Sequence, residues 1–136
     1  MIAIFLRNVV FNFVLFLIMD LIWFSISGKF FLKQLEPIAR ISEGSISPRM
    51  GAAAVVYLMM ALGLEYFVFT NAEAKSLTLL IVNGALLGFL AFGIFDFTNR
   101  ALLEHYPWPM VFVDVAWGTF LFAVTTFASY AIRKFF

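Results

Sequence analysis

Four long apolar stretches, separated by short polar segments, constrain the fold more than any other feature of the sequence. They cover about residues 4–27, 50–70, 77–97 and 109–132. As a helix, each is long enough to cross roughly 30 Å of hydrocarbon at about 1.5 Å per residue. We therefore predict an all-α polytopic membrane protein. It would be a bundle of four transmembrane helices in a single domain, residues 1–136, with both termini on one side.

The composition favours a membrane protein over a soluble one. The chain is 64% hydrophobic and 12% charged, whereas soluble domains are about 45–50% apolar and about 25% charged. The first apolar stretch is followed by no small-residue cleavage motif, so we expect it to be retained as a membrane helix. The lipid bilayer is thus the expected partner. A net charge of +1 with scattered basic residues predicts no nucleic-acid partner.

The longest polar connection, residues 28–49, opens with alternating apolar and charged residues at near-helical spacing. This pattern is typical of a short amphipathic segment that lies on the membrane surface between two transmembrane helices. We expect Phe30, Phe31 and Leu35 to dip into the lipid. Pro37 would limit the segment.

Two glycines in the third apolar stretch, Gly84 and Gly88, form a small-xxx-small pattern. Such patterns let another helix approach closely, because no side chain separates the two backbones. The pattern also arises by chance in apolar sequence. It predicts a close contact without naming the partner helix.

Three carboxylates fall within the predicted membrane layer, where charge is costly. An Asp at the centre of a membrane helix costs roughly 2.5–3.5 kcal/mol on insertion scales, so such residues are usually functional. If the four helices alternate in direction, all three carboxylates lie within roughly 10 Å of the same interface, and one tyrosine of the second helix reaches the same layer. We predict a ligand- or proton-binding site near that interface from these groups and their helix-face neighbours, Asp20, Trp23, Tyr57, Asp96, Asn99, Asp114 and Trp117. For Trp23 alone, an interfacial aromatic anchor is the more usual role.

The remaining polar residues predict no further chemistry. Glu65 belongs to the opposite side of the membrane, where we expect a structural ion pair with Arg7. His105 is the single histidine and has no metal-ligand spacing around it, and the chain has no cysteine. We therefore predict neither a metal site nor a cofactor.

Several of these residues resemble the signature of a known bacterial family, the domain-of-unknown-function 2177 family, over nearly the whole chain. The similar features are Asp20-x-x-Trp23, Tyr57 with Gly63, the stretch Phe95 to Asn99, and Asp114-x-x-Trp117-Gly118. This chain has Phe95 where the family usually has tyrosine, and its first polar loop is longer. The resemblance implies a four-helix, multi-pass protein of the bacterial inner membrane, and it brings no established activity.

The sequence leaves three functions open. The acidic layer would bind or transport a proton or a small cationic or amphipathic ligand. Because four helices make a thin wall around any pathway, a homodimer would suit this function. Alternatively, Asp96, Asn99 and Asp114 would supply acid–base groups to an enzyme acting on a lipid or isoprenoid. A third possibility is an accessory subunit of a larger membrane complex.

Overall fold

The computed structural model describes the whole chain, Met1 to Phe136, and consists almost entirely of helix. Four helical segments are long and apolar enough to cross a membrane, as predicted. The elements are α1 (Ile2–Leu35), β1 (Ile41–Ser42), β2 (Ser45–Ile46), α2 (Met50–Gly63), the π-helix η1 (Leu64–Val68), the 3₁₀-helix η2 (Ala72–Ala74), α3 (Leu77–Leu102) and α4 (Trp108–Arg133).

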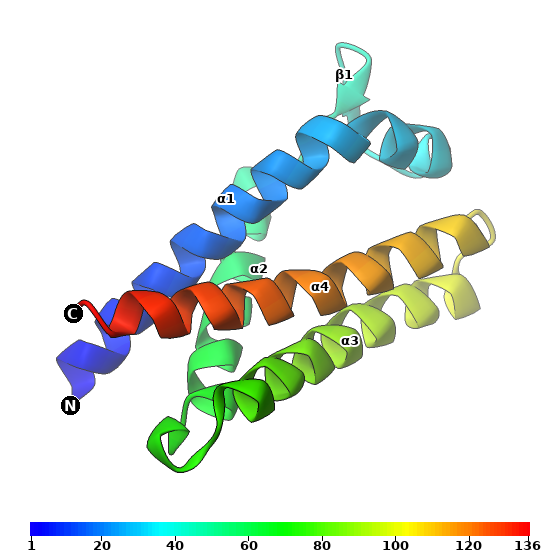
Figure 1. Cartoon of the computed structure of the whole chain (residues 1–136). Helices are drawn as coiled ribbons and strands as arrows, with labels where there is room; N and C mark the ends of the chain where they lie inside the picture. The colour runs from blue at the N-terminus through cyan, green and yellow to red at the C-terminus, as the bar shows by residue number, and fades with distance from the viewer.

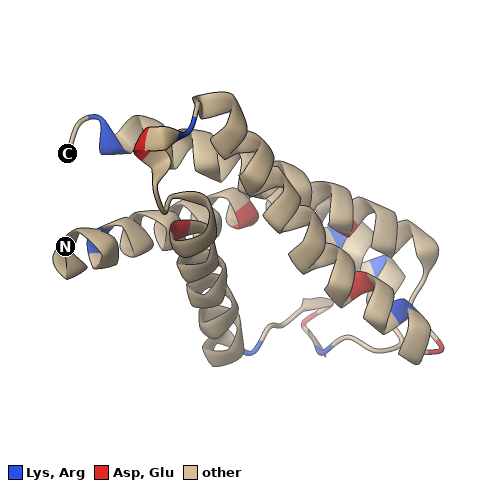
Figure 2. Cartoon of the chain, turned by 90° about the horizontal axis from the view of Figure 1, so that it is seen from below, with Lys and Arg blue, Asp and Glu red and all other residues tan.

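The two termini lie close together at one end of the molecule (Figure 1). The connection between η1 and α3 lies on the same side, and we call this the terminal end. The α1–α2 and α3–α4 connections lie on the opposite side, the far end. Basic and acidic residues are found at both ends of the molecule (Figure 2), so neither end is distinguished by charge of one sign.

Local signals set the starts of α3 and α4. Ser76 precedes α3, and its hydroxyl oxygen accepts a hydrogen bond from the backbone N–H of Leu79 at 3.1 Å. This cap satisfies one of the N–H groups that a helix start leaves without a partner. Proline occupies the first turn of α4 at Pro109, where its missing N–H costs no helical hydrogen bond.

Helix α1 is longer than predicted and absorbs the expected surface segment. It continues through Gly28 to Leu35 without interruption, although Figure 1 shows its last turns bending away from the line of its first part. Phe31 does not enter lipid, because it is only 3% exposed and belongs to a protein core with Tyr106 and Met110. The expected helix over these residues is present, but it continues α1 instead of forming a separate element. Packing on the start of α4 keeps the segment helical.

A small hairpin follows α1 and leads to α2. Ile41 pairs with Ile46 and Ser42 pairs with Ser45 in antiparallel register. The two turn residues, Glu43 and Gly44, both have positive φ, at 51° and 75°. Positive φ at both central positions is the geometry of the two-residue turn that suits the twist of a hairpin.

The second membrane segment changes its helical form near its end. The sequence predicts a regular helix over residues 50–70, but the α-helix ends at Gly63 and a π-helical turn follows over Leu64–Val68. Such turns are rare and are found frequently at functional sites. The turn contains Glu65, which is buried.

Helices α3 and α4 form the most extensive helix pair in the structure. A Cβ added to Gly84 would overlap the hydroxyl of Thr126, and one added to Gly88 would overlap the carbonyl oxygen of Gly118. The close approach predicted from the two glycines is thus confirmed, with α4 as the partner. Gly118 in turn lies against the ring of Phe92.

We expect the Gly88→Ala substitution to destabilise the protein by about 1–3 kcal/mol, because the methyl group meets backbone that cannot move aside. Gly93→Ala on the same helix is the matched control, since its Cβ would have no atom within 4 Å. Thermal unfolding in detergent measures both. Equal unfolding temperatures for the two variants would contradict the described α3–α4 contact.

Candidate functional site

Asp20 is the point where three helices meet at the far end. Its Oδ1 accepts a hydrogen bond from Trp117 Nε1 at 2.8 Å, and its Oδ2 accepts one from the Tyr57 hydroxyl at 2.7 Å. The residue is only 7% exposed. Because the donors come from α2 and α4, this one carboxyl group ties both helices to α1.

The two tryptophans of the predicted site stack on one another. The rings of Trp23 and Trp117 are 4.4 Å apart between centroids and 6° from parallel. Trp117 donates its N–H to Asp20, whereas the Nε1 of Trp23 is buried without a partner. Trp23 is therefore part of the buried cluster rather than a free interfacial anchor.

A second carboxyl group, Asp96, is fully buried beside Asp20's cluster. The Tyr106 hydroxyl donates a hydrogen bond to its Oδ1, while its Oδ2 has no partner. Asp114 lies on α4, which packs closely along α3.

Tyr106 is the residue of this cluster that the sequence did not reveal. It lies between α3 and α4 and is only 3% exposed. Burial raises the pKa of the Tyr106 phenol, and its hydrogen bond to Asp96 raises that pKa further, so the hydroxyl stays a donor. The sequence gives no sign of this contact, because it depends on how the connection folds back between the two helices.

Arg100 holds that connection in place. Its Nη1 donates to the backbone carbonyl of Tyr106 at 3.1 Å, and its guanidinium lies 4.9 Å from the centre of the Trp108 ring. It forms no ion pair with the buried carboxyl groups, since the one salt bridge in the structure is elsewhere. Arg100 therefore positions Tyr106 and does not neutralise Asp96 or Asp114.

An apolar cavity of about 590 Å³ reaches Asp114 from the side of the bundle. It lies between α2 with η1 on one side and α3 with α4 on the other. Met59, Phe67, Leu87 and Phe95 are among its apolar lining residues, and Asp114 is the one charged residue in the lining. The cavity therefore presents a hydrocarbon-like wall and a single ionisable group.

The structure thus brings the seven predicted site residues to one end in two adjoining groups. Asp20, Trp23, Tyr57 and Trp117 form the first. In the second, Asp96 is bonded to Tyr106, Asn99 lies three residues after Asp96 on α3, and Asp114 lies on the neighbouring helix α4.

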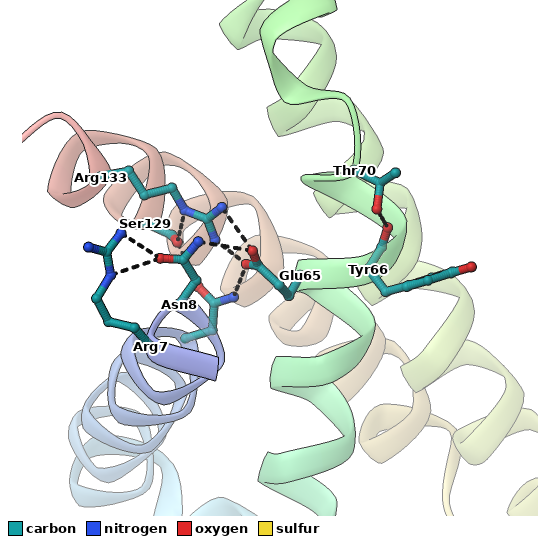
Figure 3. A network of polar contacts seen from close by, with 8 residues as sticks. Arg7, Asn8, Glu65, Tyr66, Thr70, Ser129 and Arg133 are labelled. Atoms are coloured by element: carbon teal, nitrogen blue, oxygen red, sulfur yellow. Dashed lines mark hydrogen bonds and ion pairs between the residues drawn. The ribbon is translucent and has the colours of Figure 1, made fainter. Parts of the chain in front are cut away.

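Glu65 lies near the terminal end in a separate polar network (Figure 3). Asn8 Nδ2 donates to its Oε1 at 3.1 Å, and Asn12 Nδ2 donates to its Oε2 at 3.2 Å. Arg133 donates to both oxygens and forms the salt bridge. Three helical segments are thereby joined, and the buried charge is paired on both sides.

The predicted ion pair between Glu65 and Arg7 is wrong. Arg7 instead donates to Asn8 Oδ1 at 3.4 and 3.2 Å (Figure 3). It also donates to the carbonyl oxygen of Phe136 at 3.3 Å. The π-helical turn directs Glu65 toward the end of α4, where Arg133 reaches both carboxyl oxygens. Arg7 therefore contacts Glu65 only through Asn8.

The fold and the site define a class: a polytopic helical membrane protein with buried carboxyl groups between its helices. Within that class, the chain belongs to the family described as predicted membrane protein (DUF2177), whose model matches residues 5–131. The resemblance inferred from the motifs is thus confirmed. No curated protein and no solved structure matches the chain.

We expect Tyr106→Phe to destabilise the protein by about 1–3 kcal/mol. The substitution removes the donor to Asp96 Oδ1, and Oδ2 has no donor already, so both oxygens of the buried group are left unsatisfied. Tyr66→Phe removes the hydroxyl of a residue that is 62% exposed and serves as the control. Thermal unfolding in detergent is the measurement. The assigned bond would be refuted if the two variants lost the same stability.

A double-mutant cycle separates the two arginines near Glu65. We expect Glu65→Gln and Arg133→Gln to couple by about 0.5–3 kcal/mol, because each single change removes the same ion pair. Glu65→Gln and Arg7→Gln should be close to additive. Unfolding free energies of the single and double variants measure both terms, and a larger coupling to Arg7 would overturn the assignment to Arg133.

Proposed function

We propose that the protein binds an amphipathic cation from the lipid bilayer in the cavity beside Asp114. The observation that carries this proposal is the lining: an apolar space of about 590 Å³ with one carboxyl group as its only charged side chain. Small-molecule sites are typically apolar clefts of about 300–1,000 Å³ with a few polar groups that fix the ligand. Here the apolar body would contact phenylalanine, leucine and methionine, and the positive group would face Asp114.

The arrangement of α2 supports entry from the side. Helix α2 packs on α1, and its π-helical continuation η1 packs on both α1 and α3. The first turns of α2 run at a wide angle to α3 (Figures 1 and 2). The cavity lies in this angle, and two of its lining residues, Phe67 and Phe95, are exposed on the outer surface. A ligand dissolved in the bilayer would therefore reach Asp114 without first crossing the aqueous end.

The neighbouring carboxyl group supports a positively charged ligand. Asp96 is fully buried, and its Oδ2 lacks a donor. Carboxyl groups at membrane depth usually face a partner or a cavity. A bound cation beside Asp114 would supply the positive charge that no residue of the chain supplies at this place.

The apolar core separates this site from the terminal end. The rings of Phe16 and Phe122 are 4.7 Å apart, and both side chains are fully buried with Leu121. The structure therefore supports binding from the far half of the molecule. We also propose that the protein resides in the bacterial inner membrane, because the family that it resembles is expected there.

Tetraphenylphosphonium, a lipophilic cation, is a suitable probe. We expect calorimetry in detergent to show binding that Asp114→Asn weakens at least tenfold, which equals about 1.4 kcal/mol. Glu104→Gln is the control, because it removes the same charge from an exposed residue of the α3–α4 connection. Affinity should also fall as the pH is lowered, because protonation removes the charge that attracts the cation.

The neutral compound triphenylphosphine oxide separates the contribution of the positive charge to binding from that of hydrophobicity. If it binds as tightly as the cation, and if Asp114→Asn weakens the binding of neither compound, the cavity is an apolar site without a role for the carboxyl group. Binding of neither probe would remove the proposal as stated.

A further inference from the structure

A second cavity, larger and more polar, lies at the terminal end. Its volume is about 970 Å³. Its lining comes from the start of α1, the end of η1, the connection through η2 to α3, and the end of α4. Five charged residues line it, three basic and two acidic, namely Lys75, Arg133, Lys134, Glu65 and Glu73.

The charge of one of the acids is already satisfied within the protein. Both carboxyl oxygens of Glu65 accept hydrogen bonds from Arg133 and from the two asparagines of α1 (Figure 3). Glu73 is exposed and forms no salt bridge. The cavity therefore holds one unpaired acid at its rim, against the two lysines that also have no acidic partner.

The basic residues retain N–H groups that the protein does not use. Arg133 donates from Nε to Ser129 and once from each Nη to Glu65, so two of its five N–H donors have no partner. Lys75 Nζ donates to the carbonyls of Val68 and Thr70 at 3.0 and 2.8 Å, which leaves one of three. Lys134 makes no hydrogen bond through its side chain and lies 4.6 Å from the centre of the Tyr130 ring.

Aromatic rings hold two of these cations in place. The Arg133 guanidinium lies 3.6 Å from the centre of the Phe69 ring, and the Lys134 ammonium lies over Tyr130. Phe69 and Tyr130 also line the cavity, so an apolar surface adjoins the free donors. Free N–H donors, a surplus of positive charge and an apolar wall suit a phosphate group attached to an apolar body.

We propose that this cavity binds a phosphate group, either that of an anionic phospholipid or a free phosphate ion. The donors are Lys134, the remaining N–H of Lys75 and the outer N–H groups of Arg133. Basic residues at the surface of a membrane attract anionic lipids. The site is separate from the Asp114 cavity, because the two cavities share no lining residue.

The experiment measures the unfolding temperature of the detergent-solubilised full chain with dioleoylphosphatidylglycerol or with dioleoylphosphatidylcholine. We expect phosphatidylglycerol to raise the unfolding temperature more than phosphatidylcholine. Lys134→Gln should remove at least half of that difference, and Lys134→Arg should restore it. Lys33→Gln is the control, since it removes the same charge from an exposed lysine near the far end of α1.

A parallel series with inorganic phosphate in place of chloride, at constant ionic strength, identifies the source of the phosphate group. A rise that depends on Lys134 with inorganic phosphate alone supports a free ion, and a rise with phosphatidylglycerol alone supports a lipid. The proposal is overturned if neither compound stabilises the wild-type chain. It is also overturned if Lys134→Gln and Lys33→Gln reduce the effect equally.

Discussion

The buried carboxyl group of Asp20 needs hydrogen-bond donors from other helices, and this need determines how the helices are arranged in the far half of the molecule. Asp20 takes one donor from α2 and one from α4, so three helices must meet at its depth. In hydrocarbon no water can replace a lost donor, which makes such a meeting point far more restrictive than apolar contact. Glu65 has the same effect near the terminal end, where Asn8, Asn12 and Arg133 surround it. The bundle is thus fixed at two levels by polar bonds and between them by a phenylalanine-rich core.

The sequence predicted what depends on length, hydropathy and depth. The four helices and the placement of Asp20, Asp96 and Asp114 at one end follow from spacing along helices of known rise. The details that depend on the path of connections were not predictable. Tyr106 reaches Asp96 because its loop folds back, and Arg133 rather than Arg7 reaches Glu65 because η1 changes the direction of that side chain.

Tyr106 and Phe95 divide two tasks beside the acid of the third helix. Phe95, the residue before Asp96, lines the apolar cavity. A phenol nevertheless reaches Asp96, from the connection rather than from the helix. One carboxyl oxygen of Asp96 is therefore supplied with a donor while the wall of the cavity next to it stays apolar. Asp114 is then the only charged group that a ligand in the cavity would meet.

The π-helical turn has a consequence for the geometry of the second membrane segment. An α-helix turns by about 100° per residue. A π-helical turn holds one extra residue, so all residues after it are rotated by about that angle relative to a regular helix. Residues on either side of Leu64–Val68 therefore belong to two different helical phases. Tyr57 before the turn and Phe69 after it are directed by separate registers. A relative of this chain that lacked one residue here would keep its hydrophobic length and yet present a different face to α1 and α4.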